Sequence, residues 1–144
     1  MSKHIIAFKG KSNVGKTEVI TKVRDLLLEE SEVEEIKYEK KGKDFIAILI
    51  FSGQQIGLIS QGDWGEGVRD NFKKIQQEQF CEIIMCATRT RGKTVNVIKE
   101  YDPQYKITWL KQIKCEGQKN QEQNNEKMAH KIVDLIKQKL VIPA

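Results

Sequence analysis

The sequence predicts a three-layer α/β domain with a mixed, mostly parallel sheet. Apolar runs of strand type alternate with stretches whose apolar residues recur at helical spacing, which favours parallel strands covered by helices. Two of the apolar runs are joined by a short glycine turn, which adds an antiparallel pair. A chain of 144 residues fits one domain, so we expect a single domain over residues 1–144.

The first strand and the first helix are joined by a glycine-containing octapeptide. Residues 10–17, with the sequence GKSNVGKT, match the pattern G-x-x-x-x-G-K-[ST] at every fixed position. The apolar run 4–8 precedes the octapeptide, and Val19, Val23 and Leu27 repeat at helical spacing after it. The order of strand, glycine loop and helix is the context that this pattern requires.

The residue types in the octapeptide suit phosphate binding. Gly10 and Gly15 let the backbone turn with its N–H groups pointing inward, where a side chain would block a phosphate. The start of the following helix directs its positive end at the same place. Lys16 can reach the β- and γ-phosphates, and the Thr17 hydroxyl can bind Mg²⁺. The predicted phosphate-binding residues are Gly10, Lys11, Ser12, Asn13, Val14, Gly15, Lys16 and Thr17.

On residues 5–17 the chain resembles the P-loop NTPase superfamily, whose Walker A motif has this pattern. The resemblance implies binding of a nucleoside triphosphate together with Mg²⁺. It does not choose among a kinase, an ATPase and a GTPase.

The elements after the first helix include a β-hairpin. Residues 33–38 are expected to form an edge strand, and the charged run 39–41 a solvated turn. Residues 45–51 and 55–60 are apolar strands on either side of a turn that contains glycine. A helix that leads into a hairpin looks like the Ras-like branch of the P-loop proteins. In that branch the second hairpin strand lies beside the P-loop strand, and its loop reaches the γ-phosphate.

The loop 60–67 contains the candidate acid Asp63. It is the first acid after the second hairpin strand, so we expect it to support Mg²⁺ beside Thr17. An equally weighted interpretation is a helix N-cap, because Glu66 follows Asp63 at the spacing of a capping box. The GTPase pattern D-x-x-G is not matched at Asp63.

The second half of the chain continues the α/β alternation. The patterns predict a helix over 65–79, a buried parallel strand over 80–87 and a short helix over 95–101. A last strand over 106–113 and a closing helix over 121–140 complete the series.

Two arginines follow the strand 80–87. Ligands of α/β sheets bind beyond the carboxyl ends of the strands, so Arg89 and Arg91 are candidates to stabilise a transferring phosphoryl group. The alternative is an ordinary solvated basic loop. No acid lies between Thr88 and Lys99, where a GTPase would read guanine, so ATP is expected rather than GTP.

Composition narrows the possible partners. The net charge is +5, but Lys and Arg are mixed with Glu along the chain, which argues against a dedicated nucleic-acid surface. No apolar run reaches the roughly 20 residues of a membrane helix, and no signal peptide is recognisable. The three cysteines lack the spacing of a metal site, which favours thiols in a reducing cytoplasm.

The sequence therefore predicts a cytoplasmic, Mg²⁺-dependent protein that binds a nucleoside triphosphate, with ATP favoured, and hydrolyses it or transfers its phosphoryl group. Two alternatives stay open: a Ras-like switch that binds a protein partner, and a small-molecule or nucleotide kinase. No residue stands out in the sequence as a general base for a second substrate.

Overall fold

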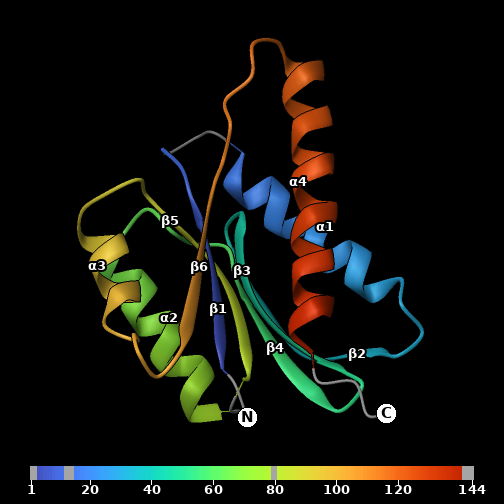
Figure 1. Ribbon diagram of the computed structural model, residues 1–144, viewed down its shortest axis with the longest axis vertical. Helices are drawn as coiled ribbons and strands as arrows, with labels where there is room; N and C mark the ends of the chain where they lie inside the picture. Colours follow the sequence, from blue (N-terminus) through green and yellow to red (C-terminus); the bar gives the residue numbers. More distant parts are fainter. Residues whose placement is uncertain (1–2, 12–14, 79–80, 141–144) are drawn as a thin grey trace.

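The computed structural model describes residues 3–11, 15–78 and 81–140, so the predictions for Ser12, Asn13 and Val14 lie outside the described residues. Within these ranges, strands and helices alternate except in the first half, where three antiparallel strands follow one another (Figure 1). In chain order the elements are β1 (His4–Lys9), α1 (Lys16–Leu28), β2 (Val33–Lys41), β3 (Asp44–Phe51), β4 (Gln54–Ile59), α2 (Gly65–Glu78), β5 (Ile83–Thr88), α3 (Lys93–Lys99), β6 (Lys106–Lys111) and α4 (Gln118–Lys139).

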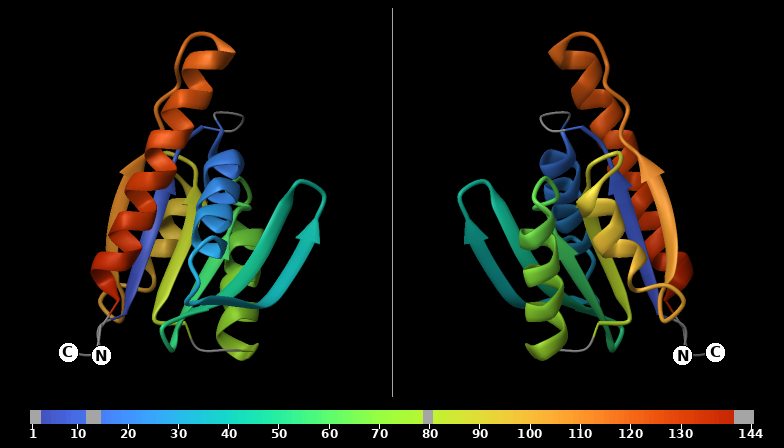
Figure 2. Two further views of the ribbon diagram at one scale, coloured as in Figure 1. Left: turned by 90° about the vertical axis from the view of Figure 1, so that its right-hand side faces the viewer. Right: turned by 90° about the vertical axis from the view of Figure 1, so that its left-hand side faces the viewer.

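The predicted three-layer α/β architecture is confirmed. Helices α1 and α4 cover one face of the sheet, and α2 and α3 cover the other (Figures 1 and 2). Strand β1 shows why both faces are buried, because alternate side chains of a strand point to opposite sides. Ile6 and Phe8 pack in the core with α1 and α4, whereas Ile5 and Ala7 pack in the core with α2 and α3.

The strand order corrects one expectation. The described strands form a six-stranded sheet in the order β2-β3-β4-β5-β1-β6, with parallel pairing from β4 to β6 and antiparallel pairing from β2 to β4. The likeness to the Ras-like branch predicted that the second hairpin strand, β4, lies beside the strand that precedes the glycine loop, β1. This prediction is wrong, because β4 and β1 are not neighbours. Strand β5 lies between them because its nearly continuous apolar sequence suits a central strand with both faces covered.

The hairpin is confirmed, and its neighbour β2 is longer than predicted. Ser52 and Gly53 both have positive φ angles, 49° and 82°, as a two-residue hairpin turn requires. Residues 39–41, expected in a turn, belong to β2 and pair with the start of β3. Charged side chains suit this position because β2 is an edge strand that leaves them in solvent.

Other elements differ from the prediction only at their ends, where sequence patterns are weakest. Strand β5 includes Thr88, and β6 ends at Lys111 rather than at residue 113. Helix α3 begins at Lys93, and α4 begins at Gln118 rather than at residue 121. None of the helices in the described part of the chain is both long enough and apolar enough to cross a membrane.

Candidate phosphate-binding site

Lys16, the first residue of α1, is fixed at the carboxyl edge of the sheet. Its side chain is only 6% exposed. Its Nζ donates hydrogen bonds to the carbonyl oxygens of Gly10 at 2.8 Å and Thr88 at 2.9 Å, and to Oδ1 of Asp63 at 2.9 Å. Burial lowers the pKa of Lys16, and the Asp63 carboxylate opposes this shift. One buried ammonium group thus contacts the end of β1, the end of β5 and the loop after β4.

Gly15 joins the glycine loop to α1 in a conformation that favours glycine. Its φ of 88° and ψ of 18° lie in the left-handed region, and it is the N-cap of α1. A Cβ at this position would lie 2.9 Å from Nδ2 of Asn125 and 3.2 Å from Nε2 of Gln112. These two buried amides hydrogen-bond to each other at 2.7 Å, so α4 and the residue after β6 support the glycine loop from behind.

Thr17 contacts an acid that the sequence analysis did not select. Its Oγ1 donates to Oδ1 of Asp44 at 3.1 Å, and Oγ of Ser60 donates to the same oxygen at 3.0 Å. Ser60 Oγ also accepts from the backbone N–H of Phe45 at 2.8 Å. The antiparallel direction of β3 brings its first residue, Asp44, to the edge where β4 ends. The hairpin predicted from the sequence could have pointed to Asp44, because the pairing of its two strands places Asp44 beside Ser60.

Asp63 reaches the glycine loop by crossing the end of β5. A Cβ at Gly62 would lie 2.4 Å from the carbonyl carbon and oxygen of Ala87, so the loop approaches β5 closely only because residue 62 is glycine. Asp63 then pairs with Lys16 and, at 3.8 Å, with Nε of Arg89. The Mg²⁺-supporting role of Asp63 stays a prediction. The helix-capping interpretation is not supported, because α2 begins at Gly65 and the carbonyl oxygen of Trp64 accepts the hydrogen bond from the N–H of Val68. Among the described residues, the Asp63 carboxylate instead pairs with cations.

The two predicted arginines are placed differently. Arg89 is half exposed and lies near Asp63, and its backbone N–H donates to Oγ1 of Thr94 at 2.9 Å. Arg91 is exposed and forms no hydrogen bond or ion pair with the described residues of the site. Lys11 is exposed as well. The structure therefore brings Arg89, but not Arg91, to the Lys16–Asp63 pair.

A small polar hollow of about 180 Å³ connects these groups, and we call it the phosphate hollow. It is lined by Gly15, Lys16, Thr17, Glu18, Lys43, Asp44, Ser60, Gly62 and Asp63. It combines the start of a helix, an ammonium group and hydroxyl groups, which together suit a phosphate.

The phosphate hollow also offers suitable ligands for Mg²⁺. Protein sites for Mg²⁺ use one or two carboxylates together with substrate phosphates and water, rather than a full cage of side chains. The hydroxyl of Thr17 and the carboxylate of Asp44 are already in contact, and Asp63 lines the same hollow. The described residues contain no group of three or more His, Cys, Asp or Glu side chains that would form a cage.

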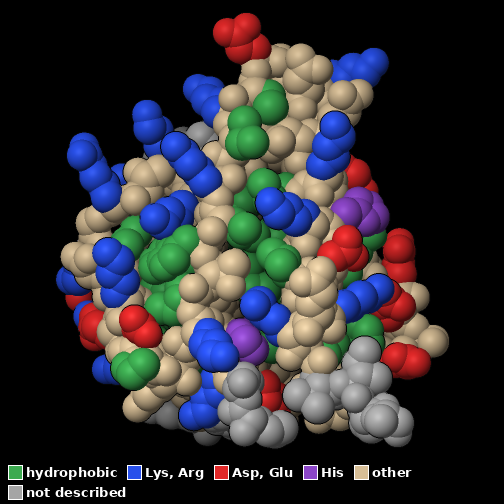
Figure 3. Space-filling model, in the orientation of Figure 1, with side chains coloured by type: hydrophobic (Ala, Val, Ile, Leu, Met, Phe, Trp, Pro, Cys, Tyr) green, Lys and Arg blue, Asp and Glu red, His purple; other side chains and the backbone are tan. Residues whose placement is uncertain are grey.

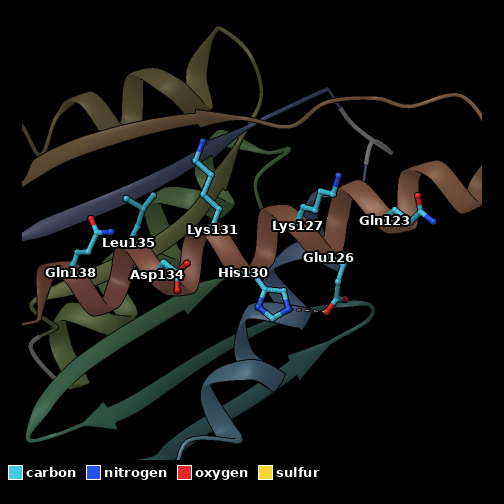
Figure 4. A pocket seen from close by; sticks show the side chains of 8 residues that line it. All are labelled: Gln123, Glu126, Lys127, His130, Lys131, Asp134, Leu135 and Gln138. Carbon is cyan, nitrogen blue, oxygen red and sulfur yellow. Dashed lines mark hydrogen bonds and ion pairs between the residues drawn. The ribbon is translucent and has the colours of Figure 1, made fainter.

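A larger hollow lies elsewhere, along the outer surface of α4, with a volume of about 740 Å³ (Figure 4). We call it the α4 surface. All the side chains that line it come from one helix, and Glu126 and His130 pair with each other at 3.2 Å. Lys and Arg side chains are spread over the face of the molecule seen in Figure 3 rather than gathered in one patch.

Comparison of the chain with protein-family models, with curated proteins and with solved structures gave no match. The functional argument therefore rests on the residues and contacts of the chain itself.

Proposed function

We propose that this protein binds a nucleoside triphosphate with Mg²⁺ at the phosphate hollow and hydrolyses it or transfers its γ-phosphoryl group. The observation that carries the proposal is the placement of Lys16. An ammonium group is rarely buried unless it is paired with acceptors or binds an anion, since burial disfavours its charge. Here it is held at the start of α1, beneath a glycine loop whose pattern fits phosphate binding.

Each part of the hollow has a role in this proposal. The loop 10–17 holds the phosphates, and Lys16 neutralises their charge. The Lys16 ammonium has three N–H donors, and its three contacts use them all, so a phosphate oxygen would replace Asp63 as the third partner. Released from Lys16, Asp63 would be available to support the metal, as the sequence predicts.

The metal would be held by Thr17 with a carboxylate from Asp63 or Asp44. When bound, Mg²⁺ supplies positive charge that neutralises the phosphate oxygens. Arg89, close to Asp63, is better placed than Arg91 to stabilise the transferring group.

The two alternatives are affected differently by the strand order. The Ras-like switch rested on a hairpin strand beside the P-loop strand, and β5 occupies that place. The kinase alternative needs only an acceptor site next to the γ-phosphate, so it keeps its basis.

Calorimetry with a non-hydrolysable ATP analogue and Mg²⁺ tests the proposal. Lys16→Ala should weaken binding tenfold or more, because a charge-assisted contact to phosphate contributes about 1.5–3 kcal/mol. Lys22→Ala is a matched control on the same helix, since Lys22 pairs with Glu126 and does not line the hollow. Equal affinities for the wild type and Lys16→Ala, with both proteins folded, would show that the site assignment is wrong.

The base preference is tested in the same protein by competition. ATP and GTP would each displace a fluorescent ATP analogue, and we expect ATP to do so at the lower concentration. Stronger displacement by GTP would contradict the prediction drawn from the acid-free segment after β5.

A further inference from the structure

Strand β6 forms one outer edge of the sheet. In the described part of the chain its only strand partner is β1, and Figure 2 shows it on the outer side of β1. The N–H of Lys106, at the start of β6, donates to the carbonyl oxygen of Lys3 at 2.8 Å, so the even-numbered residues direct their backbone groups at β1. The N–H and C=O groups of Ile107, Trp109 and Lys111 therefore face away from the sheet, because these groups alternate in direction along a strand.

The middle of β6 is apolar and only partly covered. The residues of β1 that pair with it are buried, whereas its own are partly exposed: Ile107, Thr108, Trp109 and Leu110. Ile107 and Trp109 pack at the margin of the core that includes α2 and α3, and Leu110 packs at the margin of the core that includes α1 and α4. A strand added beside β6 would bury more apolar surface on both faces.

The opposite edge strand, β2, is protected against such pairing. It carries charged residues of both signs along its length, and its register shifts between Glu35 and Lys37. Its acids are also paired, Glu35 with Arg24 and Glu39 with Lys37 and Lys74. Charges and bulges on an edge strand hinder the addition of another chain. Strand β6 pairs with β1 in an unbroken register and has charged residues only at its two ends, so its edge is open to a partner strand.

The charge around β6 is positive. Lys106 begins the strand, Lys111 ends it, and Lys9 of β1 lies beside Lys111 in the register of the two strands. Figure 4 shows Lys127 and Lys131 pointing from α4 to the side of the helix along which β6 runs. None of these five lysines forms an ion pair with a described residue. Their charge is therefore available to a partner.

The imidazole of His4 lies in this positive field. His4 pairs with Lys106 in the register of β1 and β6. Burial lowers the pKa of His4, and the charges of Lys139 and Lys106 lower it further. Figure 3 shows Lys and Arg side chains over the face that contains β6, whereas few Asp and Glu side chains lie near its middle. A segment that binds along β6 should accordingly carry negative charge.

Two other occupants fit this edge less well. A second copy of the chain would bring its own lysines to the same edge, and like charges on paired strands are destabilising. A nucleic acid matches the positive charge but lacks the regularly spaced N–H and C=O groups of an extended peptide. Only a peptide backbone can satisfy the outward groups of β6 in the manner of a sheet.

We propose that the outer edge of β6 binds an extended acidic segment of another protein as an added β-strand. The backbone of this segment would pair with the outward groups of Ile107, Trp109 and Lys111, and its apolar side chains would cover the partly exposed middle of β6. Lys106 and Lys111 are five residues apart, or roughly 17 Å along a strand, so acids at both ends of the segment would meet them. The inference does not depend on nucleotide binding.

A designed peptide tests the inference. The probe is a fluorescein-labelled nonapeptide, acetyl-DEVTVTVED-amide, and its binding to the full chain is followed by fluorescence anisotropy. Saturable binding is expected, and the double variant Lys106→Glu/Lys111→Glu should weaken it about tenfold or more, because two attractions become repulsions. Both lysines are exposed, so the fold should be kept, which circular dichroism checks.

The matched control is Lys40→Glu/Lys41→Glu on the other edge strand. It replaces two exposed lysines of β2 and changes the net charge by the same amount. Peptide affinity should then stay within about threefold of wild type, since screening limits distant charges. Failure of the peptide to bind the wild type, or equal losses of affinity in the two double variants, would overturn the inference.

Strand addition is distinguished from simple charge attraction by amide hydrogen exchange. When the peptide binds, exchange should slow at Ile107, Trp109 and Lys111, whose N–H groups would donate to it. Two further peptides are N-methylated at the even or at the odd positions, which keeps every charge. One of them should bind about tenfold or more weakly than the other, because only alternate N–H groups face β6. Binding without slower exchange, or equal affinities of the two methylated peptides, would contradict strand addition.

The other occupants are separate outcomes of the same measurements. A decamer of single-stranded DNA that binds more tightly than the peptide, and less tightly to Lys106→Glu/Lys111→Glu, would assign the edge to a nucleic acid. A dimer of the protein alone, with slow exchange already present at Ile107, Trp109 and Lys111, would assign it to a second copy. Either result overturns the inference. All measurements are made without nucleotide, so their failure leaves the proposed phosphate site standing.

Discussion

The phosphate hollow and the α4 surface differ in a way that size does not reveal. The hollow along the α4 surface has a volume of about 740 Å³ but is lined only by residues 123–138 of one helix. Most of the side chains that line it are exposed. The phosphate hollow encloses about 180 Å³ and is lined by the starts of α1 and β3 together with the loop after β4. Its buried lysine and its hydroxyls are held by contacts between these distant segments.

The comparison teaches that convergence of segments is a better guide to chemistry than volume. Exposed charges on one helix are hydrated and move freely, so they hold a ligand weakly. Groups fixed by several strands are already oriented before a ligand arrives, which lowers the cost of binding.

Among the substitutions that test this difference, Gly15→Ala should have the largest effect on nucleotide affinity. The left-handed φ of 88° costs an alanine roughly 1–2 kcal/mol, and the new Cβ would meet the amide of Asn125. The glycine loop must therefore shift, and we expect nucleotide affinity to fall tenfold or more. Calorimetry measures the affinity, and thermal unfolding measures the loss of stability.

Gly53→Ala is the matched control for Gly15→Ala. Gly53 has a similar φ of 82° but lies in the hairpin turn, where a Cβ would meet no atom within 4 Å. It should lower stability through the backbone alone and leave nucleotide affinity unchanged. Equal losses of affinity in the two variants would mean that general destabilisation, not the glycine loop, governs binding.

A smaller effect is expected when the carboxylates of the two regions are exchanged for amides. Asp63→Asn should weaken Mg²⁺-dependent nucleotide binding several-fold and lower the melting temperature, because the amide leaves the buried Lys16 ammonium without its carboxylate partner. Asp134→Asn, on the α4 surface, should leave the Mg²⁺ titration unchanged.

The Asp63 experiment also separates its roles. If Asp63 only competes with phosphate for Lys16, the Asn variant should bind nucleotide more tightly in the absence of Mg²⁺. If Asp63 does not support the metal at all, the Mg²⁺ titrations of variant and wild type should coincide. Either result would remove Asp63 from the metal site.

The smallest effect concerns pH. Burial lowers the pKa of Lys16 from its ordinary value of 10.5, so the bound phosphate loses its cationic partner at lower pH than it would beside an exposed lysine. Nucleotide affinity should therefore decline as pH rises through the alkaline range below 10.5. Lys16→Ala should show no such decline in affinity, which would identify Lys16 as the titrating group.

Stability should change in the opposite direction over the same alkaline window. The folded chain holds the Lys16 proton less tightly than the unfolded chain, so between the lowered pKa and 10.5 the unfolded state binds more protons. The contribution of Lys16 to the free energy of unfolding thus rises with pH there. A contribution that falls with pH in wild type relative to Lys16→Ala would contradict the direction of the shift.

The sequence by itself determined the features that depend on neighbouring residues. The glycine loop, the first helix and the hairpin follow from short patterns, because backbone freedom, helical spacing and turn chemistry act over a few residues. The existence of the α/β layers followed from the order of these patterns.

Only the tertiary structure decided which strands are neighbours. The insertion of β5 between β4 and β1 depends on pairing between distant segments, which no local pattern encodes. That insertion makes Gly62 cross the end of β5 and brings Asp63 to Lys16, while the antiparallel β3 brings Asp44 to Thr17. The identity of the acids at the site is therefore a property of the sheet, because hydrogen bonds between strands fix which chain ends meet at one edge.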